Sequence, residues 1–164
     1  MPGKNQPAPL PFVMQVLTPQ YLIEGTAPGA TQLYLPRAEE YWYPITLTDA
    51  RIRTVGRPDL RTRSIPQIVV GGNSVVAVIF RADVSQLERY DVWKAYKEPR
   101  AGVFHIGPYL IQGKMMFLGS NRFDLVVPMV EVQITQASLE TDLGDLSAPF
   151  MLVNTDWMSS YLPA

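Results

Sequence analysis

The 164-residue sequence contains no cysteine, a single histidine and few charged residues. Without cysteine the chain cannot form a disulfide, use a thiolate nucleophile or bind a metal through sulfur. Charged residues make up 18% of the chain, below the roughly 25% that is typical of soluble domains. We therefore expect part of its apolar surface to be covered in an assembly. The histidine, His105, stands between Phe104 and Ile106 in an expected strand, and we interpret it as structural.

Charge of one sign and long hydrophobic runs are also lacking. The formal net charge is -1, which gives no global attraction to nucleic acid or to an acidic membrane surface. No apolar run approaches the ~20 residues needed to cross a bilayer. Residues 1–11 lack the apolar core of a signal peptide. These absences predict a cytoplasmic protein without a transmembrane segment.

What the sequence does contain is a pattern that occurs twice. Three short segments recur in the same order: Tyr21–Gly25 as Tyr109–Gly113, Pro44 as Pro128, and Ile65–Val70 as Ala148–Val153. The offsets are 88, 84 and 83 residues. Nearly constant spacing of this kind indicates an internal duplication. Chance similarity between short segments is the alternative.

Most of the chain has the pattern of short β-strands. In 43–55, Ile45 and Leu47 share one face while threonines alternate on the other. The apolar phase then moves to Ile52, which predicts a bulge at Asp49-Ala50. Runs such as Val75–Phe80 are rich in β-branched residues and are separated by turn residues. Short, regularly spaced strands are typical of barrels and sandwiches.

One stretch between the repeats has helical spacing instead. Asp83 is a plausible N-cap, and four apolar residues follow it at intervals of three before Pro99: Val84, Leu87, Tyr90 and Trp93. The predicted fold is therefore mainly β, with two tandem small β-barrel or β-sandwich modules joined by one short α-helix. The predicted boundaries are a flexible proline-rich arm (1–11), a first β module (12–80), a helical connector (81–100) and a second β module (101–164).

Equivalent loops of the two expected modules carry opposite charge. The hairpin 51–63 contains a single acidic residue, Asp59, among five arginines: Arg51, Arg53, Arg57, Arg61 and Arg63. The corresponding part of the second module carries Glu140, Asp142 and Asp145 and no basic residue. Complementary loops can fix the register of a protein contact. Alternatively, the arginines can bind phosphates, or the hairpin is merely solvated. Of the two binding interpretations we prefer a protein contact, because the chain as a whole is not basic.

Two segments resemble a known family. Tyr43–Ala50 and Phe150–Met158 are similar to the paired strands of small Sm-like β-barrel domains found in uncharacterised bacterial proteins. The resemblance implies a binding or assembly module without catalytic residues. It transfers no RNA-contacting residue to a numbered position of this chain.

The sequence thus predicts a non-enzymatic interaction or scaffolding protein without a cofactor. It is expected to assemble with itself, as a homo-oligomer, or with a protein partner through β edges and the charged loops. The alternative is a nucleic-acid-binding module that uses the arginine-rich hairpin 51–63. A third hypothesis is a hydrolase whose carboxylates are brought together by the fold.

Overall fold

The computed structural model describes residues 12–27, 44–55, 57, 59–80, 97–117, 126–136 and 146–164. These residues form ten β-strands and two short 3-10 turns, η2 (Gly72–Ser74) and η4 (Thr155–Trp157). The strands are β1 (Phe12–Leu17), β2 (Tyr21–Ala27), β3 (Ile45–Thr54), β4 (Arg63–Val70), β5 (Ala77–Phe80), β6 (Glu98–Ile106), β7 (Tyr109–Phe117), β8 (Val126–Gln136), β9 (Leu146–Asn154) and β10 (Met158–Pro163).

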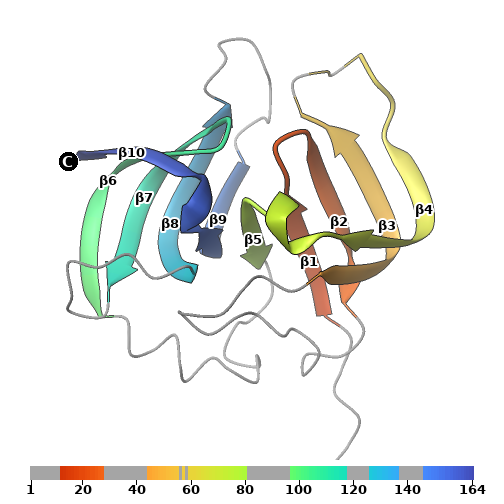
Figure 1. Cartoon of the computed structure of the whole chain (residues 1–164), viewed down its shortest axis with the longest axis horizontal. Coiled ribbons are helices and arrows are strands. Elements are labelled where there is room, and N and C mark those ends of the chain that lie inside the picture. The colour runs from red at the N-terminus through yellow and green to blue at the C-terminus, as the bar shows by residue number, and fades with distance from the viewer. Residues whose placement is uncertain are drawn as a thin grey trace, which may run out of the picture.

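All ten strands belong to one antiparallel sheet in the order β10-β6-β7-β8-β9-β5-β1-β2-β3-β4. The first half of the chain contributes β1–β5 and the second half β6–β10, and the two halves lie side by side (Figure 1). They meet where β5 pairs with β9 over four residue pairs, from Ala77 opposite Val153 to Phe80 opposite Phe150. Because this sheet is open, β4 and β10 lie at its two ends.

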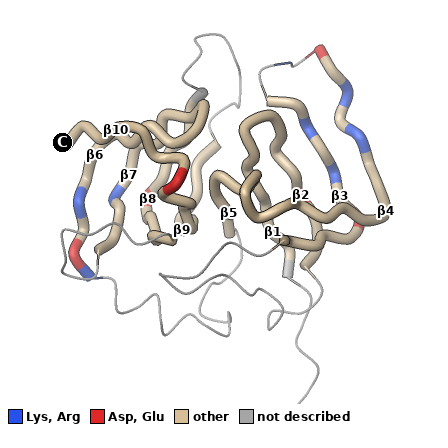
Figure 2. Tube along the Cα trace, viewed as in Figure 1, with Lys and Arg blue, Asp and Glu red and all other residues tan. Residues whose placement is uncertain are grey.

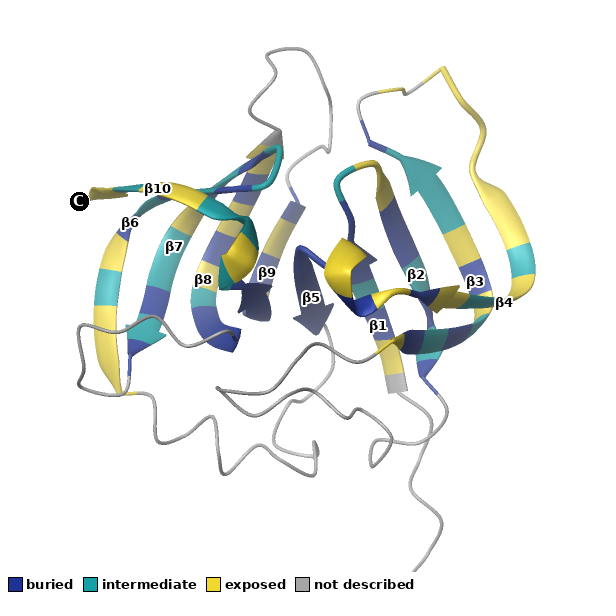
Figure 3. Ribbon diagram, viewed as in Figure 1, coloured by how far each residue is buried: buried dark blue, intermediate teal, exposed yellow. Residues whose placement is uncertain are grey.

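Each half buries its own core against a different face of the central strands. Ile79 of β5 and Met151 of β9 belong to a cluster formed mainly by the second half, whereas Val78 and Leu152 belong to a cluster formed mainly by the first half. All of β5 is buried, while most of β4 is exposed (Figure 3). Burial on both faces explains why Val75–Phe80 is continuously apolar instead of alternating.

The predicted bulge at Asp49-Ala50 is confirmed. The β2–β3 register shifts between Glu24 and Thr26, opposite these residues, and Asp49 has a φ of 48°. A corresponding shift occurs between β7 and β8, where Glu131 has a φ of 53°. At the first bulge, Gly25 lies so close to β3 that an added Cβ would be 2.9 Å from the Cβ of Leu47. Glycine is therefore required there by space.

The mainly β prediction is confirmed, whereas no closed barrel is present among the described strands. The strands form one continuous open sheet, because β5 and β9 are paired to each other and neither is left as a module edge. The proline-rich arm 1–11 and the predicted helix from Val84 to Trp93 lie outside the described residues. Strand β6 begins at Glu98, within the predicted connector 81–100.

Among the residues that the structure describes, no helix is long and apolar enough to cross a membrane.

Candidate functional site

The two end strands of the sheet, β4 and β10, are the candidate interaction site. Among the described strands, each of them pairs on one side only: β4 with β3, and β10 with β6. The two large hydrophobic side chains with the greatest exposure in the described residues lie here, Val69 of β4 at 59% and Leu162 of β10 at 69%. An unpaired strand edge with exposed apolar residues can accept another strand.

Strand β4 is held in place by its inward-facing side chains. Ile65 and Ile68 are half-buried and Val70 is buried, and all three pack on the core of the first half. Val69 lies between Ile68 and Val70 and points the other way, because neighbouring residues of a strand face opposite sides of the sheet. Ile65 faces inward despite its spacing, since it pairs with Ala50 beyond the bulge at Asp49. The edge thus combines a fixed backbone with an exposed apolar side chain.

Strand β10 is held against β6 by an aromatic stack. The rings of Tyr161 and Phe104 are parallel to within 9° with centroids 4.6 Å apart. Gly102 of β6 leaves room for this contact, since an added Cβ would lie 2.4 Å from the carbonyl oxygen of Leu162. Leu162 itself remains exposed.

Charge is distributed unevenly over this fold. Strands β5 and β9 carry no charged residue, and β10 carries none either, whereas arginines lie along β3 and β4 (Figure 2). On β4 the only charged residue is Arg63, at its first position. Neither edge therefore presents the lysines with which exposed strands often avoid pairing.

The structure places the five predicted arginines on or near the β3–β4 hairpin but does not gather them into one patch. Arg63 is opposite Ile52 and Arg51 is opposite Ser64, so Arg51 and Arg63 face opposite sides of the sheet. Arg51 and Arg53 line one surface pocket together with Glu24, and Arg61 and Arg63 line another. The basic charge is divided between two surfaces.

The fifth arginine, Arg57, forms an ion pair with Asp59. Arg57 donates two hydrogen bonds to the carboxylate of Asp59, from Nε at 3.0 Å and from a terminal nitrogen at 2.8 Å. These hydrogen bonds hold the pKa of Asp59 below its usual value, and they raise the pKa of Arg57. Both side chains are exposed, so the pair orders the hairpin tip only weakly.

The predicted acidic partners Glu140, Asp142 and Asp145 lie outside the described residues. Leu146, the first described residue after them, lines the same pocket as Arg51 and Arg53. A contact between the basic and acidic loops stays a prediction.

Sequence reasoning missed the polar contacts that join the two halves. Asn154, only 3% exposed, donates from Nδ2 to the carbonyl oxygen of Val75 at 2.9 Å and accepts the backbone N–H of Asp156 at 3.1 Å. Its own N–H donates to the carbonyl oxygen of Val76 at 2.9 Å. A lone asparagine beside turn residues gave no sequence signal for this role, because its partner lies 79 residues away.

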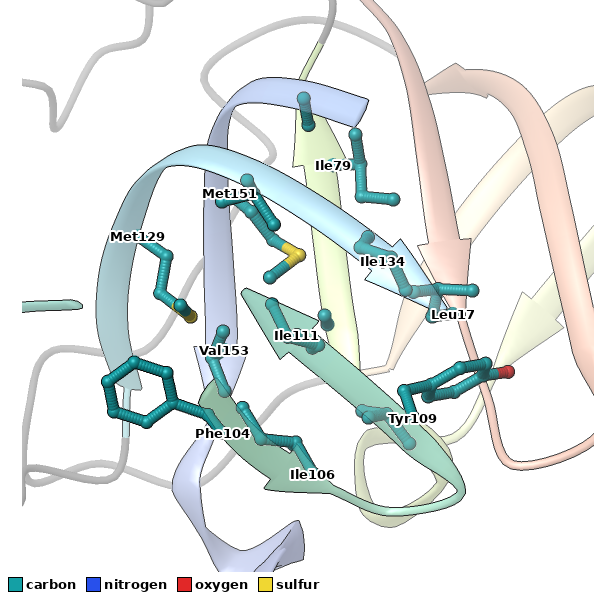
Figure 4. Packing of buried hydrophobic residues seen from close by; sticks show 14 of the residues in the cluster. Leu17, Ile79, Phe104, Ile106, Tyr109, Ile111, Met129, Ile134, Met151 and Val153 are labelled. Atoms are coloured by element: carbon teal, nitrogen blue, oxygen red, sulfur yellow. The ribbon is translucent and has the colours of Figure 1, made fainter. Parts of the chain in front are cut away.

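A second contact across the halves comes from Tyr109. Its buried hydroxyl donates to the carbonyl oxygen of Thr18, in the β1–β2 turn. Figure 4 shows its ring reaching from β7 toward the strands of the first half, beside Ile134 and Leu17. Burial raises the pKa of this hydroxyl. Tyr109 and Asn154 thus join the two halves through buried hydrogen bonds beside a largely apolar contact.

His105 and the glycine-rich turn at residues 71–74 lie within the β framework of the described part of the chain. Within it, no three histidine, aspartate or glutamate side chains are close enough to hold a metal ion. His105 lies in β6 between strands β7 and β10, as an interior strand residue. In the glycine-rich turn between β4 and β5, Gly72–Ser74 form η2 and Gly71 precedes it.

Comparison with known proteins adds no identification: no family model matches the chain, and neither the curated proteins nor the solved structures contain a significant match.

Proposed function

We propose that this protein is a non-enzymatic assembly module that binds a β-strand of another polypeptide, a second copy or a protein partner, at β4 and β10, the edges that no further described strand covers. The main support for this proposal is that the two most exposed large hydrophobic residues of the described chain, Val69 and Leu162, lie on these two edges. Backbone N–H and C=O groups along an edge supply affinity, and side chains at alternate positions supply selectivity.

The charge pattern supports the same proposal. An edge that is nearly free of charge costs little to desolvate when another strand covers it. Arg51 and Arg53 of β3 stand behind the β4 edge, together on one face of the sheet. There they can contact acidic groups of the bound polypeptide, and steer its approach without entering the strand pairing.

We also propose that the two halves derive from an internal duplication. The strand order within the first half is β5-β1-β2-β3-β4 and within the second half β10-β6-β7-β8-β9, so both place their fifth strand beside their first. Each half has a 3-10 turn immediately after its fourth strand. The resemblance to Sm-like domains remains a prediction, since no comparison bears on it.

Nucleic-acid binding by the arginine hairpin is the second candidate. Its support is the density of arginines on β3 and β4, and the division of these residues between two surfaces argues against a single phosphate-binding track. Reversal of Arg51 and Arg53 to glutamate tests it. If the hairpin binds nucleic acid, wild-type protein binds a single-stranded oligonucleotide in a salt-dependent manner and the double reversal abolishes binding.

The proposed function is tested by placing charge on both edges. We expect wild-type protein to have a mass above its 18.4 kDa monomer in light scattering, and the double variant Val69→Lys, Leu162→Lys to be monomeric. Val13→Lys is the matched control, because Val13 is 54% exposed but lies on β1, which is paired on both sides. Hydrogen exchange supplies the second measurement, with amides of β4 and β10 better protected in concentrated than in dilute protein. An unchanged mass in the double variant, or edge amides that exchange equally fast at both concentrations, would contradict the proposal.

A further inference from the structure

The sheet already contains one junction between a fourth and a fifth strand. Strand β9, the fourth of the second half, pairs with β5, the fifth of the first half. The strands left at the ends are β4, the fourth of the first half, and β10, the fifth of the second half. The two free edges are thus the same two kinds of strand that the internal junction joins.

A constant offset relates the junction to the free edges. The 3-10 turns begin at Gly72 and Thr155, which are 83 residues apart (155 minus 72). Ala77 and Ser160 are also 83 residues apart (160 minus 77). Ala77 of β5 lies opposite Leu17 of β1. Ser160 of β10 lies opposite His105 of β6, which is the same pairing of fifth and first strands in the second half. Transferred by this offset, the internal register predicts four edge pairs: Val70 opposite Ser160, Val69 opposite Tyr161, Ile68 opposite Leu162, and Gln67 opposite Pro163.

Burial at the internal junction shows what these edge residues lack. Val69 corresponds to Leu152 and Leu162 corresponds to Ile79, and both of those residues are 0% exposed at the internal junction. At the free edges the exposed fractions are 59% and 69%. Val69 and Leu162, the two most exposed large hydrophobic side chains of the described residues, therefore occupy positions that a strand pairing like β5–β9 would bury.

We propose that the occupant of each edge is a second copy of this chain, with β10 of one copy pairing antiparallel to β4 of the next in the register given above. This inference rests on the proposed function and names its partner. The contact is heterologous, because it joins two different surfaces. Every copy added leaves one β4 and one β10 free, so assembly proceeds beyond a dimer until a ring closes or a filament forms. The β4 end and the C-terminal end of β10 lie on opposite sides of the molecule, which allows both to be occupied at once (Figure 1).

The junction between copies is weaker than the internal one for a specific reason. The residue that corresponds to Asn154 is Gly71, which immediately precedes η2 as Asn154 precedes η4. Gly71 has no side chain to repeat the hydrogen bond from Asn154 to Val75. We therefore expect the junction between copies to be weaker than the internal one by the contribution of this hydrogen bond.

Engineered disulfides test the register. Because the chain has no native cysteine, every disulfide that forms must involve the introduced residues. Residues directly opposite in an antiparallel pair have Cα atoms about 4.5–5.5 Å apart, within the range of a disulfide. A chain with Ile68→Cys is mixed with a chain with Leu162→Cys under mild oxidation. The control mixes Val69→Cys with Leu162→Cys, because in the proposed register these two side chains face opposite sides of the sheet. We expect the first mixture to give at least a tenfold higher yield of mixed disulfide than the control, and a chain carrying both Ile68→Cys and Leu162→Cys to give trimers and larger species on a denaturing gel.

Each alternative result separates this inference from the proposed function. Homodimers linked through Cys at position 68 alone would mean that β4 pairs with itself, which overturns the head-to-tail register and leaves edge assembly intact. Equal yields from both mixtures, with assembly still abolished by Val69→Lys and Leu162→Lys, would also overturn it while keeping edge assembly. A monomeric wild type would overturn this inference and leave a strand of another protein as the occupant of the edges.

A gain-of-function variant provides a second test that does not depend on oxidation. Gly71 is exposed, has an extended backbone with a φ of -62°, and an added Cβ would meet nothing within 4 Å. We expect Gly71→Asn to lower the dissociation constant of self-association about tenfold, since it restores the donor that Asn154 supplies internally. Gly71→Ala, which has no donor, is the control. Equal dissociation constants for the two variants would contradict the proposed equivalence of the junctions.

Discussion

The side-chain amide of Asn154 is one of the buried polar anchors between the two halves, and its removal should be costly. In Asn154→Ala, the carbonyl oxygen of Val75 loses its donor, and Val75 is 0% exposed. A buried polar group left without a partner costs about 1–3 kcal/mol. The N–H of Asp156 loses its acceptor too, but Asp156 is exposed and water can replace the asparagine oxygen. With the small cavity that is also left, we expect a total loss of ~2–4 kcal/mol in the free energy of unfolding.

Chemical denaturation measures this loss, and thermal unfolding should show it as a decrease in Tm of roughly 4–16 °C for a chain of this size. Asn73→Ala is the control, because Asn73 is exposed and its backbone carbonyl, which accepts from Trp157 Nε1 at 3.2 Å, is retained. Asn154→Asp refines the test by keeping the shape while removing the donor. Burial would raise the pKa of the new carboxyl above its unfolded value, so this variant should regain stability as the pH falls through that range. A change below about 0.5 kcal/mol for Asn154→Ala, no larger than an ordinary surface substitution, would refute the argument.

Two further predictions concern packing and titration. Gly25→Ala should destabilise the chain by about 1–3 kcal/mol because its Cβ would lie 2.9 Å from the Cβ of Leu47, whereas Gly71→Ala should be neutral or stabilising by up to about 1 kcal/mol; equal free energies of unfolding would show that β2 and β3 can move apart. Tyr109→Phe should cost about 1–2 kcal/mol at neutral pH, because the carbonyl of Thr18 loses its donor. In the wild type, burial raises the pKa of the Tyr109 hydroxyl, so an unfolded chain releases this proton at about pH 10 while the folded chain retains it. Stability should therefore fall as the pH rises above ~10, and a Tyr109→Phe variant with an identical alkaline profile would contradict this assignment.

Local structure could be predicted from the sequence because it depends on neighbouring residues. The alternation at Ile45 and Leu47 and the phase change near Ile52 predicted β3 and its bulge, and both are present. The repeated segments Tyr21–Gly25 and Tyr109–Gly113 begin the second strand of each half. The match of Pro44 to Pro128 was less accurate, since Pro44 precedes β3 while Pro128 lies inside β8.

Long-range pairing could not be predicted in the same way. The continuous apolar run Val75–Phe80 is compatible with any strand that is buried on both faces, and nothing local indicates that its partner is β9. That partnership decides whether the halves close separately or share one sheet. The candidate site depends on the same long-range strand order, which leaves β4 and β10 as the two ends of the sheet. For this reason the arginines, which are conspicuous in the sequence, drew attention to the hairpin, while Val69 and Leu162 did not.

The geometry also indicates why the internal junction and the free edges differ. A strand pairing that joins two halves of one chain is intramolecular, so it forms regardless of protein concentration. It can therefore be fully apolar and anchored by Asn154, with Leu152 and Ile79 at 0% exposure. An edge that was equally apolar and equally anchored would associate in every encounter, including during folding. Strands β4 and β10 instead carry one large exposed apolar residue each, and a glycine where the anchor would be. If the proposed function is correct, such an edge associates only when a complementary edge is concentrated enough, and we expect assembly of this protein to be reversible and to depend on its concentration.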